Sequence, residues 1–510
     1  MIVVPVVGAL LIGLMARYGS KANRSRIPAR VTVLKPLSAA ISIGTGGPFG
    51  AEGPIIATGG ALGSLLGQIF SVTGVERKIL LAAGAAAGMT AIFGSPVSAV
   101  LLAVELLLFE FSSRSTIPVA LACATAAGLR LYFFSAEPIF AMPEVAVSNA
   151  PALLAFLVLG GVVGLAAAIV SRAVYWVEDQ FERLPVHWMW WPAIGAVGVG
   201  AIGIVAPRTL GVGYDNIEDI VAEALPLSLI AWLCGMKLLS WLIALGSGTS
   251  GGTLAPLLTI GAGLGAVLAA GGNALGLEIS LGVAALVGMS AMFAGASRAL
   301  LASVVFAFET TLQPNALPAL LAGATAAHLI ARLVTRHSIM TERISRRGLV
   351  VPNSYLPDPL AHMQVGAVMS DDFQTLPASL SAEELAHRIS AHDPEVSRRQ
   401  ACLLADPEGL LAGIVTRGDL LKCAPGATLL QAGSSDLVVA YPDESVAEVL
   451  ARMFHHDIGR LPVVSRESAL QAVGYLGRAE ILVAQRAGAD GTPESGWLEE
   501  MRRKRREKRP

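Results

Sequence analysis

The sequence predicts an all-α, polytopic membrane domain of broken helices, followed by a smaller soluble α/β region. Of the 510 residues, 54% are hydrophobic and 15% are charged, whereas about a quarter of the residues in soluble domains are charged. The charge deficit ends near His337, and earlier runs such as Ile79–Val104 and Leu238–Leu277 contain no charged residue. Because a spanning helix needs ~20 such residues, residues 1–345 are expected to cross the bilayer many times.

The apolar part also contains an internal repeat. Three patterns recur in the same order about 200 residues later: Pro54–Gly63 with Pro256–Gly265, Gly88–Phe93 with Gly288–Phe293, and the spacing Pro96 to Glu105 with Leu300 to Glu309. Paired halves whose helices are broken by glycine at corresponding positions are typical of an inverted repeat with a binding site at the midplane. Short, broken segments at that depth are tolerated where they are buried in protein or line an aqueous path.

Glu52 is the residue around which the first half is organised. It is the only Asp, Glu, Lys or Arg in residues 37–74, and an ionisable group in a membrane segment is by default a functional hypothesis. Gly50 and Gly53 allow close approach of the backbone to a ligand, and Pro54 suits the first turn of a helix. Glu52 is therefore expected just before a helix start, where free N–H groups and the helix dipole favour an anion. Its carboxylate can fill that position or leave it to a dissolved anion, which is a gate.

The second half supplies a corresponding loop at Gly251–Pro256. Two helix N-termini that point inward would make an anion site without any full positive charge. Such a site binds an anion more weakly than a buried Arg or Lys would, and conduction needs weak binding. The alternative interpretation is that Glu52 is an N-terminal helix acid at the membrane edge. Glycines such as Gly59, Gly63 and Gly265 are explained by helix packing alone.

These residues resemble the CLC family of voltage-gated chloride channels and anion/proton exchangers. Three motifs carry the resemblance: Gly50-Ala-Glu52-Gly-Pro54, Gly252-Thr-Leu-Ala-Pro256, and Phe93-Gly-Ser-Pro96 followed by Glu105. The resemblance implies a homodimer with one anion pathway in each subunit and Glu52 as the gating glutamate. It also implies an anion-binding set that comprises Gly50, Ala51, Gly53, Gly252, Thr253, Leu254 and Met340.

Three departures from the family pattern bear on function. The serine loop that touches the anion in the family is represented only by Arg24–Pro28, so this loop is expected to be shortened and Ser25 is a doubtful ligand. Met340 stands where the family has a pore tyrosine, which removes a hydroxyl donor. Exchangers carry two adjacent glutamates at the internal proton site, but here Glu105 is followed by Leu106, and a proton path needs an ionisable relay. We therefore expect an uncoupled channel; the alternatives are an anion/proton exchanger and a non-conducting, truncated member.

The soluble region contains two copies of one small α/β unit. Residues 365–425 and 430–487 each contain a polar helix and end in strand, turn and helix, which resembles a CBS-domain pair. The resemblance implies adenine nucleotide binding (ATP, ADP or AMP) through Thr416 and Asp419, while the second copy has the weaker Gly477 and Glu480. A dimerising module without a ligand remains the alternative.

The remaining features limit the other function classes. A net charge of −1 argues against a nucleic-acid partner, and four scattered cysteines argue against a disulfide framework or a metal site. The chain has no catalytic cysteine loop or phosphate loop, so we expect no enzyme and no required cofactor; three membrane carboxylates are too few for a divalent-cation transporter. Residues 346–364 are expected to be a linker and 488–510 a basic, solvated tail. The apolar start without a signal peptide predicts a short N-terminus, and the expected location is a bacterial inner or plasma membrane with the CBS pair in the cytoplasm.

Overall fold

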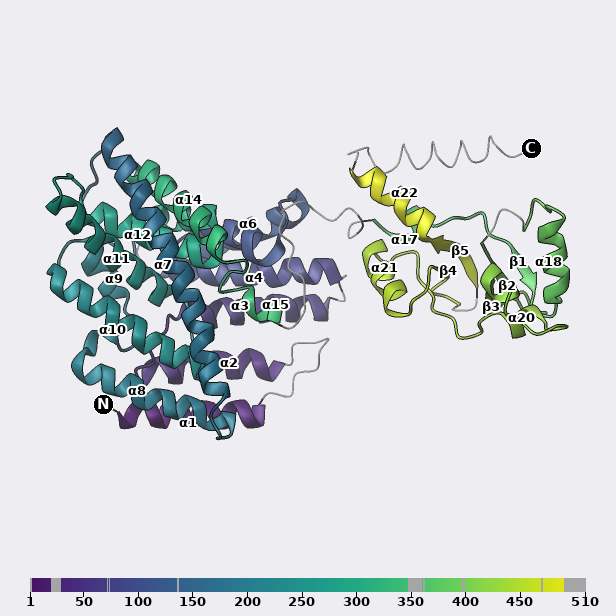
Figure 1. Cartoon of the computed structure of the whole chain (residues 1–510), viewed down its shortest axis with the longest axis horizontal. Coiled ribbons are helices and arrows are strands. Elements are labelled where there is room, and N and C mark those ends of the chain that lie inside the picture. Colours follow the sequence, from purple (N-terminus) through teal and green to yellow (C-terminus); the bar gives the residue numbers. More distant parts are fainter. Residues whose placement is uncertain are drawn as a thin grey trace. The chain divides into compact units, whose positions relative to one another are not determined.

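A computed structural model describes residues 2–19, 29–70, 72, 74–134, 137–346, 360, 363–396, 400–468 and 471–489. The chain divides into two compact units, Met1–Leu356 and Pro357–Pro510, which are called the membrane unit and the soluble unit below (Figure 1). Ser25, most of the predicted linker and residues 490–510 of the predicted tail lie outside the described residues.

In the described part of the membrane unit, the regular elements are helices joined by loops. Its elements are α1 (Val3–Gly19), α2 (Ala29–Gly44), α3 (Glu52–Ile69), α4 (Gly74–Phe93), α5 (Pro96–Leu102), the π-helical turn η1 (Ala103–Leu108), α6 (Ser113–Phe133), α7 (Ala150–Glu182), η2 (Trp188–Trp190), α8 (Trp191–Val205), η3 (Pro207–Thr209), α9 (Tyr214–Val221), α10 (Leu227–Gly246), α11 (Leu254–Ala274), α12 (Leu281–Ser297), α13 (Leu300–Thr311), η4 (Pro314–Ala316), α14 (Leu317–Val334) and α15 (Glu342–Arg346).

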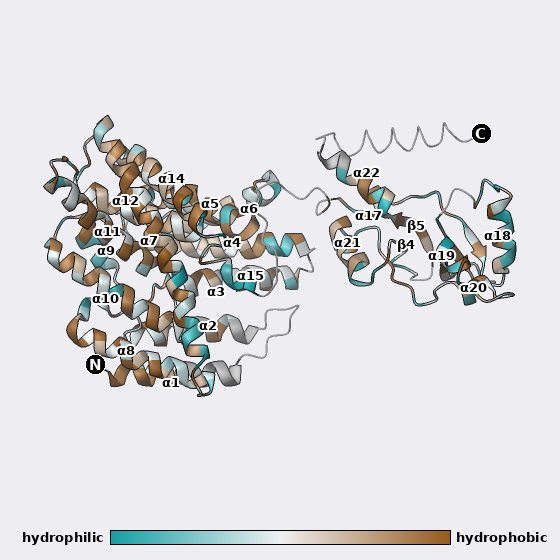
Figure 2. Ribbon diagram, in the orientation of Figure 1, coloured by the Kyte–Doolittle hydropathy of each residue, from teal (hydrophilic) through white to brown (hydrophobic). Residues whose placement is uncertain are grey.

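Helix length and hydropathy follow the predicted pattern of long and broken helices. Among the described residues, six helical segments are long and apolar enough to cross a membrane: α6, α7, η2 with α8, α10, α11, and η4 with α14. Others, including α12 and α13, are apolar but shorter. Figure 2 shows hydrophobic residues along most of these helices, in contrast to the largely hydrophilic α18 (Ala382–Ser390) of the soluble unit.

The two halves of the membrane unit pack in the same way. A Cβ atom added to Gly59 of α3 would overlap the carbonyl oxygen of Gly84 in α4, and one added to Gly265 of α11 would overlap that of Ala284 in α12. Side chains cannot fit where the backbones approach this closely, so the packing role expected of Gly59 and Gly265 is confirmed. Helix α12 is buried along almost its whole length, which puts the α11–α12 pair at the centre of the unit.

The soluble unit contains two small sheets. In the first, β1 (Thr375–Pro377) pairs in parallel with β2 (Ala401–Ala405), which pairs antiparallel with β3 (Leu411–Thr416); in the second, β4 (Arg460–Val464) and β5 (Ala472–Gly477) are antiparallel. The helices are α17 (Val365–Val368), α18, α19 (Arg417–Leu420), α20 (Leu429–Ala432), α21 (Val446–His455) and α22 (Arg478–Ala489).

The two α/β units exchange their first segments. The N–H of Val365 donates to the carbonyl of Glu444 at 2.9 Å, and Val365 is buried in the core that surrounds Val446 and Leu461. In return, Leu429 belongs to the core of the first unit. Each hydrophobic core is therefore completed by residues that precede the other unit in sequence.

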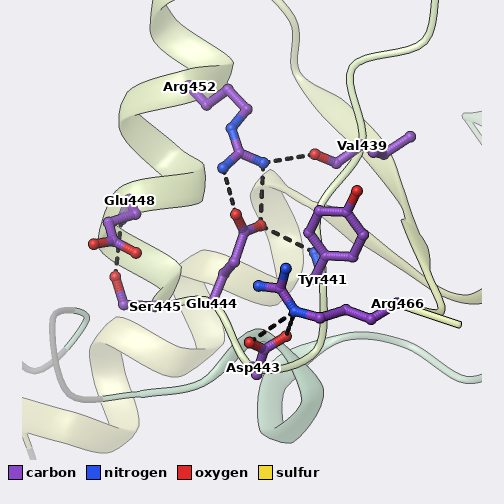
Figure 3. Close-up of polar contacts among 8 residues, drawn as sticks. All are labelled: Val439, Tyr441, Asp443, Glu444, Ser445, Glu448, Arg452 and Arg466. Atoms are coloured by element: carbon purple, nitrogen blue, oxygen red, sulfur yellow. Dashed lines mark hydrogen bonds and ion pairs between the residues drawn. The ribbon is translucent and has the colours of Figure 1, made fainter. Parts of the chain in front are cut away.

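A polar cluster supports this exchange in the second unit (Figure 3). Arg452 donates two hydrogen bonds to the carboxylate of Glu444, at 2.6 and 3.1 Å, and a third to the carbonyl of Val439 at 2.6 Å. Beside it, Arg466 pairs with Asp443 at 2.8 Å and its guanidinium lies 4.3 Å from the ring centre of Tyr441. The Glu444 side chain is 15% exposed and that of Asp443 is 57% exposed, so the inner pair is the better shielded from solvent.

Candidate functional site

The two glycine loops of the repeat meet in a short antiparallel bridge. Gly50 donates its N–H to the carbonyl of Gly252 at 3.3 Å, and Gly252 donates to the carbonyl of Gly50 at 3.2 Å. A Cβ atom on Gly53 would lie 2.8 Å from the Cα of Gly252. The start of α3 and the start of α11 are therefore held side by side, although they are about 200 residues apart in sequence.

Glu52 is the first residue of α3, but its carboxylate lies on the other half of the repeat. Its Oε1 accepts a hydrogen bond from the N–H of Ala255 at 2.9 Å, in the first turn of α11, and its Oε2 accepts from the hydroxyl of Tyr214 at 3.2 Å. Glu52 is 2% exposed. Because the N-terminus of a helix presents free N–H groups and a partial positive charge, the carboxylate occupies a position that suits an anion.

The loop glycines make room for this carboxylate. A Cβ atom on Gly252 would lie 2.6 Å from Glu52 Oε1, and one on Gly50 would overlap the same carboxylate. Thr253 is the residue just before α11 and Leu254 is its first, buried residue. The structure brings six of the predicted anion-binding residues together, in the two loops or in the helix starts that follow them: Gly50, Ala51, Gly53, Gly252, Thr253 and Leu254.

Tyr214, which sequence reasoning missed, provides the hydroxyl at this site. It begins α9 directly after Gly213, whose φ is +78°. The ring of Tyr214 packs edge-on against Phe93 at 5.6 Å and against Phe140 at 6.2 Å, as measured between ring centres. The Gly-Val-Gly-Tyr order indicates only a turn before a helix, so no local pattern links Tyr214 to Glu52.

A buried lysine holds the loop that leads to Tyr214, and the expectation of an anion site without a full positive charge stays a prediction. Lys237 of α10 is completely buried, and its ammonium group donates to the carbonyls of Thr209 at 3.0 Å and Gly211 at 2.9 Å. A Cβ atom on Gly213, the neighbour of Tyr214, would lie 3.1 Å from Lys237 Nζ. A lone lysine inside an apolar helix is a signal of function that the sequence analysis did not use.

The remaining predicted site residues belong to segments other than the two glycine loops. Met340 is in the turn between α14 and α15 and is 38% exposed; the carbonyl of its neighbour Ile339 accepts from the hydroxyl of Tyr175 at 2.5 Å. Leu106 lies in η1, partly buried against the hydrophobic core. Ser25 lies outside the described residues.

Glu105 is bound to the start of a helix in the other half. Its two carboxylate oxygens accept from the N–H groups of Leu301 at 3.1 Å and Ala302 at 3.0 Å, in the first turn of α13. Glu309 of α13 makes the matching contacts, accepting from Val97 at 3.0 Å and Ser98 at 2.8 Å in α5. Both carboxylates are therefore bound to backbone N–H groups, and a role of Glu105 in proton transfer would require it to leave Leu301 and Ala302 or to act while bound to them.

In the soluble unit, Thr416 and Asp419 are already bonded to each other. Thr416 precedes α19, and both its N–H and its hydroxyl donate to Asp419 Oδ2, at 2.8 and 2.7 Å. At the matching place in the second α/β unit, the N–H of Gly477 donates to Glu480 at 3.2 Å. The N–H of Asp419 donates in return to the Thr416 hydroxyl at 3.3 Å, so the two residues form a capping box that stabilises the start of α19 without any ligand. The Asp419 carboxylate keeps further acceptor positions that a ligand could use.

Family models match both parts of the chain. A model described as voltage gated chloride channel matches residues 11–332, and the CBS domain model matches residues 365–426 and 432–487. The chain is 24% identical to the chloride channel protein CLC-f of Arabidopsis thaliana, over 91% of this chain and 70% of that protein. It is 27% identical to the H(+)/Cl(-) exchange transporter ClcA of Vibrio campbellii, over 65% of this chain and 76% of that protein.

Solved structures agree with the helical architecture. The crystal structure of a slow cyanobacterial Cl−/H+ antiporter superimposes with a TM-score of 0.62 at 23% identity, covering 68% of this chain and 86% of that chain. A eukaryotic CLC transporter superimposes with a TM-score of 0.58 at 19% identity, covering 94% of this chain and 89% of that chain. The predicted fold class, a helical membrane domain with broken helices followed by an α/β pair, is confirmed.

Proposed function

Because the chain belongs to the CLC family of voltage-gated chloride channels and carries a CBS-domain pair, we propose that it conducts chloride or a similar small anion through a pathway gated by Glu52. Membership of this family makes the protein a multi-pass integral membrane protein that transports anions, and not an enzyme. The gate and the mode of transport are the parts that we propose.

One observation carries the proposal of a gate. The Glu52 carboxylate is bound to the N–H of Ala255 at the start of α11, at the kind of helix end where dissolved anions bind in other proteins. A carboxylate and a halide compete for the same donors, so anion entry requires Glu52 to move away.

The gate is tested by chloride efflux from liposomes that contain the purified protein. Glu52→Gln removes the negative charge at nearly constant volume, and Glu52→Ala removes the group altogether; both are expected to speed efflux. Glu182→Gln, which neutralises an exposed glutamate at the end of α7, is the matched control and is expected to leave efflux unchanged. Equal efflux from wild type and both Glu52 variants would exclude a gate at this residue.

We propose an uncoupled channel as the mode of transport. Leu106 supports it, because an apolar residue beside Glu105 cannot relay a proton. The second candidate is an anion/proton exchanger, which is favoured by the similarity to a protein named as an H(+)/Cl(-) exchange transporter. A reversal potential that follows only the chloride gradient supports the channel, whereas a shift on adding a pH gradient supports the exchanger. Absence of flux in wild type and Glu52→Ala would support a non-conducting member.

The resemblance to the family also supports a homodimer in a bacterial inner or plasma membrane, with the CBS pair in the cytoplasm. Helix α6 presents Ile117, Leu121 and Leu129 on its exposed surface, and such an apolar face suits either lipid or a second copy. Mass measurement of the protein in detergent tests the dimer.

The CBS pair is proposed to bind an adenine nucleotide at Thr416 and Asp419. The carboxylate and hydroxyl can bind ribose hydroxyl groups, and Asp419 Oδ2 already accepts two hydrogen bonds from Thr416. ATP, ADP and AMP are each expected to raise the melting temperature of the full chain, and Asp419→Ala to abolish the rise. Glu408→Ala, at an exposed position, is the control. No rise in the wild-type protein would favour a dimerising module without a ligand.

A further inference from the structure

We propose that the hydroxyl of Tyr214 is a latch that holds Glu52 in its closed position, and that the same hydroxyl becomes a ligand for the anion when the carboxylate leaves. This inference rests on the proposed Glu52 gate and assigns a positioning residue to it. The residue belongs to neither glycine loop, and it contributes from a third element, α9.

The carboxylate of Glu52 is held at two points by groups from two elements. The N–H of Ala255 binds Oε1 at 2.9 Å and the hydroxyl of Tyr214 binds Oε2 at 3.2 Å. Because the two donors bind different oxygens, they fix the plane of the carboxylate, and the backbone N–H groups of Leu254 and of Glu52 itself also interact with it. Hydrogen bonds to charged groups are stronger than those between neutral groups, so loss of the hydroxyl should loosen the closed state measurably.

The tyrosine ring is fixed in place by its surroundings. Phe93 lies edge-on at 5.6 Å with an angle of 66° between the rings, and Phe140 lies at 6.2 Å with an angle of 65°. Phe93 is 1% exposed and Phe140 is 0% exposed. Since both neighbours are themselves immobilised by packing, the hydroxyl can reach Glu52 without a large loss of ring freedom.

The backbone that leads into Tyr214 is fixed as well. The buried ammonium group of Lys237 binds the carbonyls of Thr209 and Gly211 at 3.0 and 2.9 Å. Gly211 and Gly213 have φ angles of +69° and +78°, which glycine adopts without strain. The loop therefore turns sharply and delivers Tyr214 to the first position of α9.

The same geometry offers a binding place to an anion once the gate opens. Departure of the carboxylate frees the donors that point at it, among them the Ala255 N–H and the Tyr214 hydroxyl. A halide ion accepts from O–H and N–H groups, so it can replace the carboxylate on both. Tyr214 thereby supplies a hydroxyl donor in a chain that has Met340 where the family resemblance expects a tyrosine.

The competing explanation is that Tyr214 only fills space and that its hydroxyl finds Glu52 because it must bind something. Under this explanation, removing the oxygen while keeping the ring would lower stability slightly but would not change gating. The latch therefore predicts faster efflux from Tyr214→Phe only while Glu52 is present, whereas the competing explanation predicts no change in efflux.

The test compares wild type, Tyr214→Phe, Glu52→Ala and the double variant, as full chains in liposomes with equal protein content. Tyr214→Phe is expected to increase chloride efflux about ten-fold in the presence of Glu52, as befits loss of a charge-assisted hydrogen bond. In the Glu52→Ala background it is expected to give no increase, and to weaken chloride binding several-fold in calorimetry. Tyr132→Phe, the same change on an exposed tyrosine of α6, is the control and is expected to have neither effect.

A second variant keeps the result interpretable if Tyr214→Phe does not reconstitute. Incorporation of 3-fluorotyrosine at position 214 keeps the hydroxyl and makes it a stronger donor, so efflux is expected to slow. Unchanged efflux with either variant, while Glu52→Ala still accelerates it, would overturn the latch and leave the proposed gate standing. If Glu52→Ala itself has no effect, the proposed gate is wrong and the latch is overturned with it.

Discussion

Glu105 and Glu309 each cap the short helix that carries the other. The carboxylate of Glu105 binds the first turn of α13, which contains Glu309, and the carboxylate of Glu309 binds the first turn of α5, which continues into the turn that contains Glu105. A negative charge at a helix N-terminus satisfies free N–H groups and interacts favourably with the helix dipole. The pair therefore fastens the two halves of the repeat together at equivalent positions.

The first prediction concerns the reciprocal capping by Glu105 and Glu309. Glu105→Ala and Glu309→Ala each remove two hydrogen bonds to backbone N–H groups, and each is expected to cost about 1.5–3 kcal/mol of stability. Thermal unfolding in detergent measures the cost, and the two variants should be affected to a similar degree. Glu76→Ala, which removes a half-exposed carboxylate 3.6 Å from Arg114, is the control and should cost less than 1 kcal/mol. A large effect of Glu105→Ala alone would contradict the reciprocal arrangement.

The second prediction concerns the bridge between the glycine loops. Gly252→Ala places a methyl group 2.5 Å from the carbonyl oxygen of Gly50 and 2.6 Å from Glu52 Oε1, so it must separate the loops or displace the carboxylate. Chloride efflux is expected to lose its dependence on Glu52, with Gly252→Ala and its combination with Glu52→Gln indistinguishable. Gly235→Ala is the matched control, because a Cβ atom at Gly235 in α10 meets nothing within 4 Å. Retention of a full Glu52→Gln effect in Gly252→Ala would show that the loops tolerate the methyl group.

The third prediction concerns the buried lysine. Lys237→Met keeps the apolar stem but leaves the carbonyls of Thr209 and Gly211 without their donor, and buried unpaired acceptors cost about 1–3 kcal/mol each. We expect the free energy of unfolding to fall by about 2–4 kcal/mol. Tyr214 should also lose its fixed position, so chloride efflux from liposomes should be faster than in the wild type. Lys78→Met is the control, since Lys78 is exposed and donates to the carbonyl of Leu108 at 2.9 Å. Equal melting temperatures for the wild type and Lys237→Met would contradict this structural role.

The fourth prediction compares the two neighbouring ion pairs in Figure 3. Glu444→Ala leaves Arg452 without its paired carboxylate in a site that is largely shielded, at a cost of about 2 kcal/mol. Hydrogen exchange in peptides that cover residues 439–452 of the full chain should accelerate about 30-fold. Asp443→Ala removes the more exposed pair with Arg466 and should change exchange much less. A larger acceleration of hydrogen exchange in Asp443→Ala than in Glu444→Ala would show that solvent exposure does not determine how much each ion pair stabilises the unit.

The outer pair also has a predictable pH dependence. The hydrogen bond from Arg466 lowers the pKa of Asp443 below its ordinary value. The pair therefore contributes its full stability above the pKa of an unfolded aspartate, about 4, and loses it as the pH falls through the lower folded value. The difference in hydrogen exchange between wild type and Asp443→Ala, present at pH 7, should shrink below about pH 4. A difference that grows with acidity would contradict this assignment.

Local sequence patterns were enough to predict the architecture of both units and to single out Glu52 as a candidate gate. Apolar runs of spanning length, the glycine–proline brackets at Gly53–Pro54 and Gly252–Pro256, and the repeat are local patterns, and helix length, helix breaks and membrane depth depend on local patterns. A polar helix was predicted in each copy of the soluble α/β unit, and the structure has these helices at Ala382–Ser390 and Val446–His455.

The groups that surround Glu52 are set by contacts between segments that are distant in sequence. Its partners Ala255 and Tyr214 are 203 and 162 residues away in sequence, and no periodicity within a segment specifies such a distance. The partners of Lys237 were hidden for the same reason, because its ammonium group binds the carbonyls of a loop outside its own helix. The polar partners of a lone charge are chosen by packing between segments, whereas its burial is already determined by the apolar residues on either side of it in sequence.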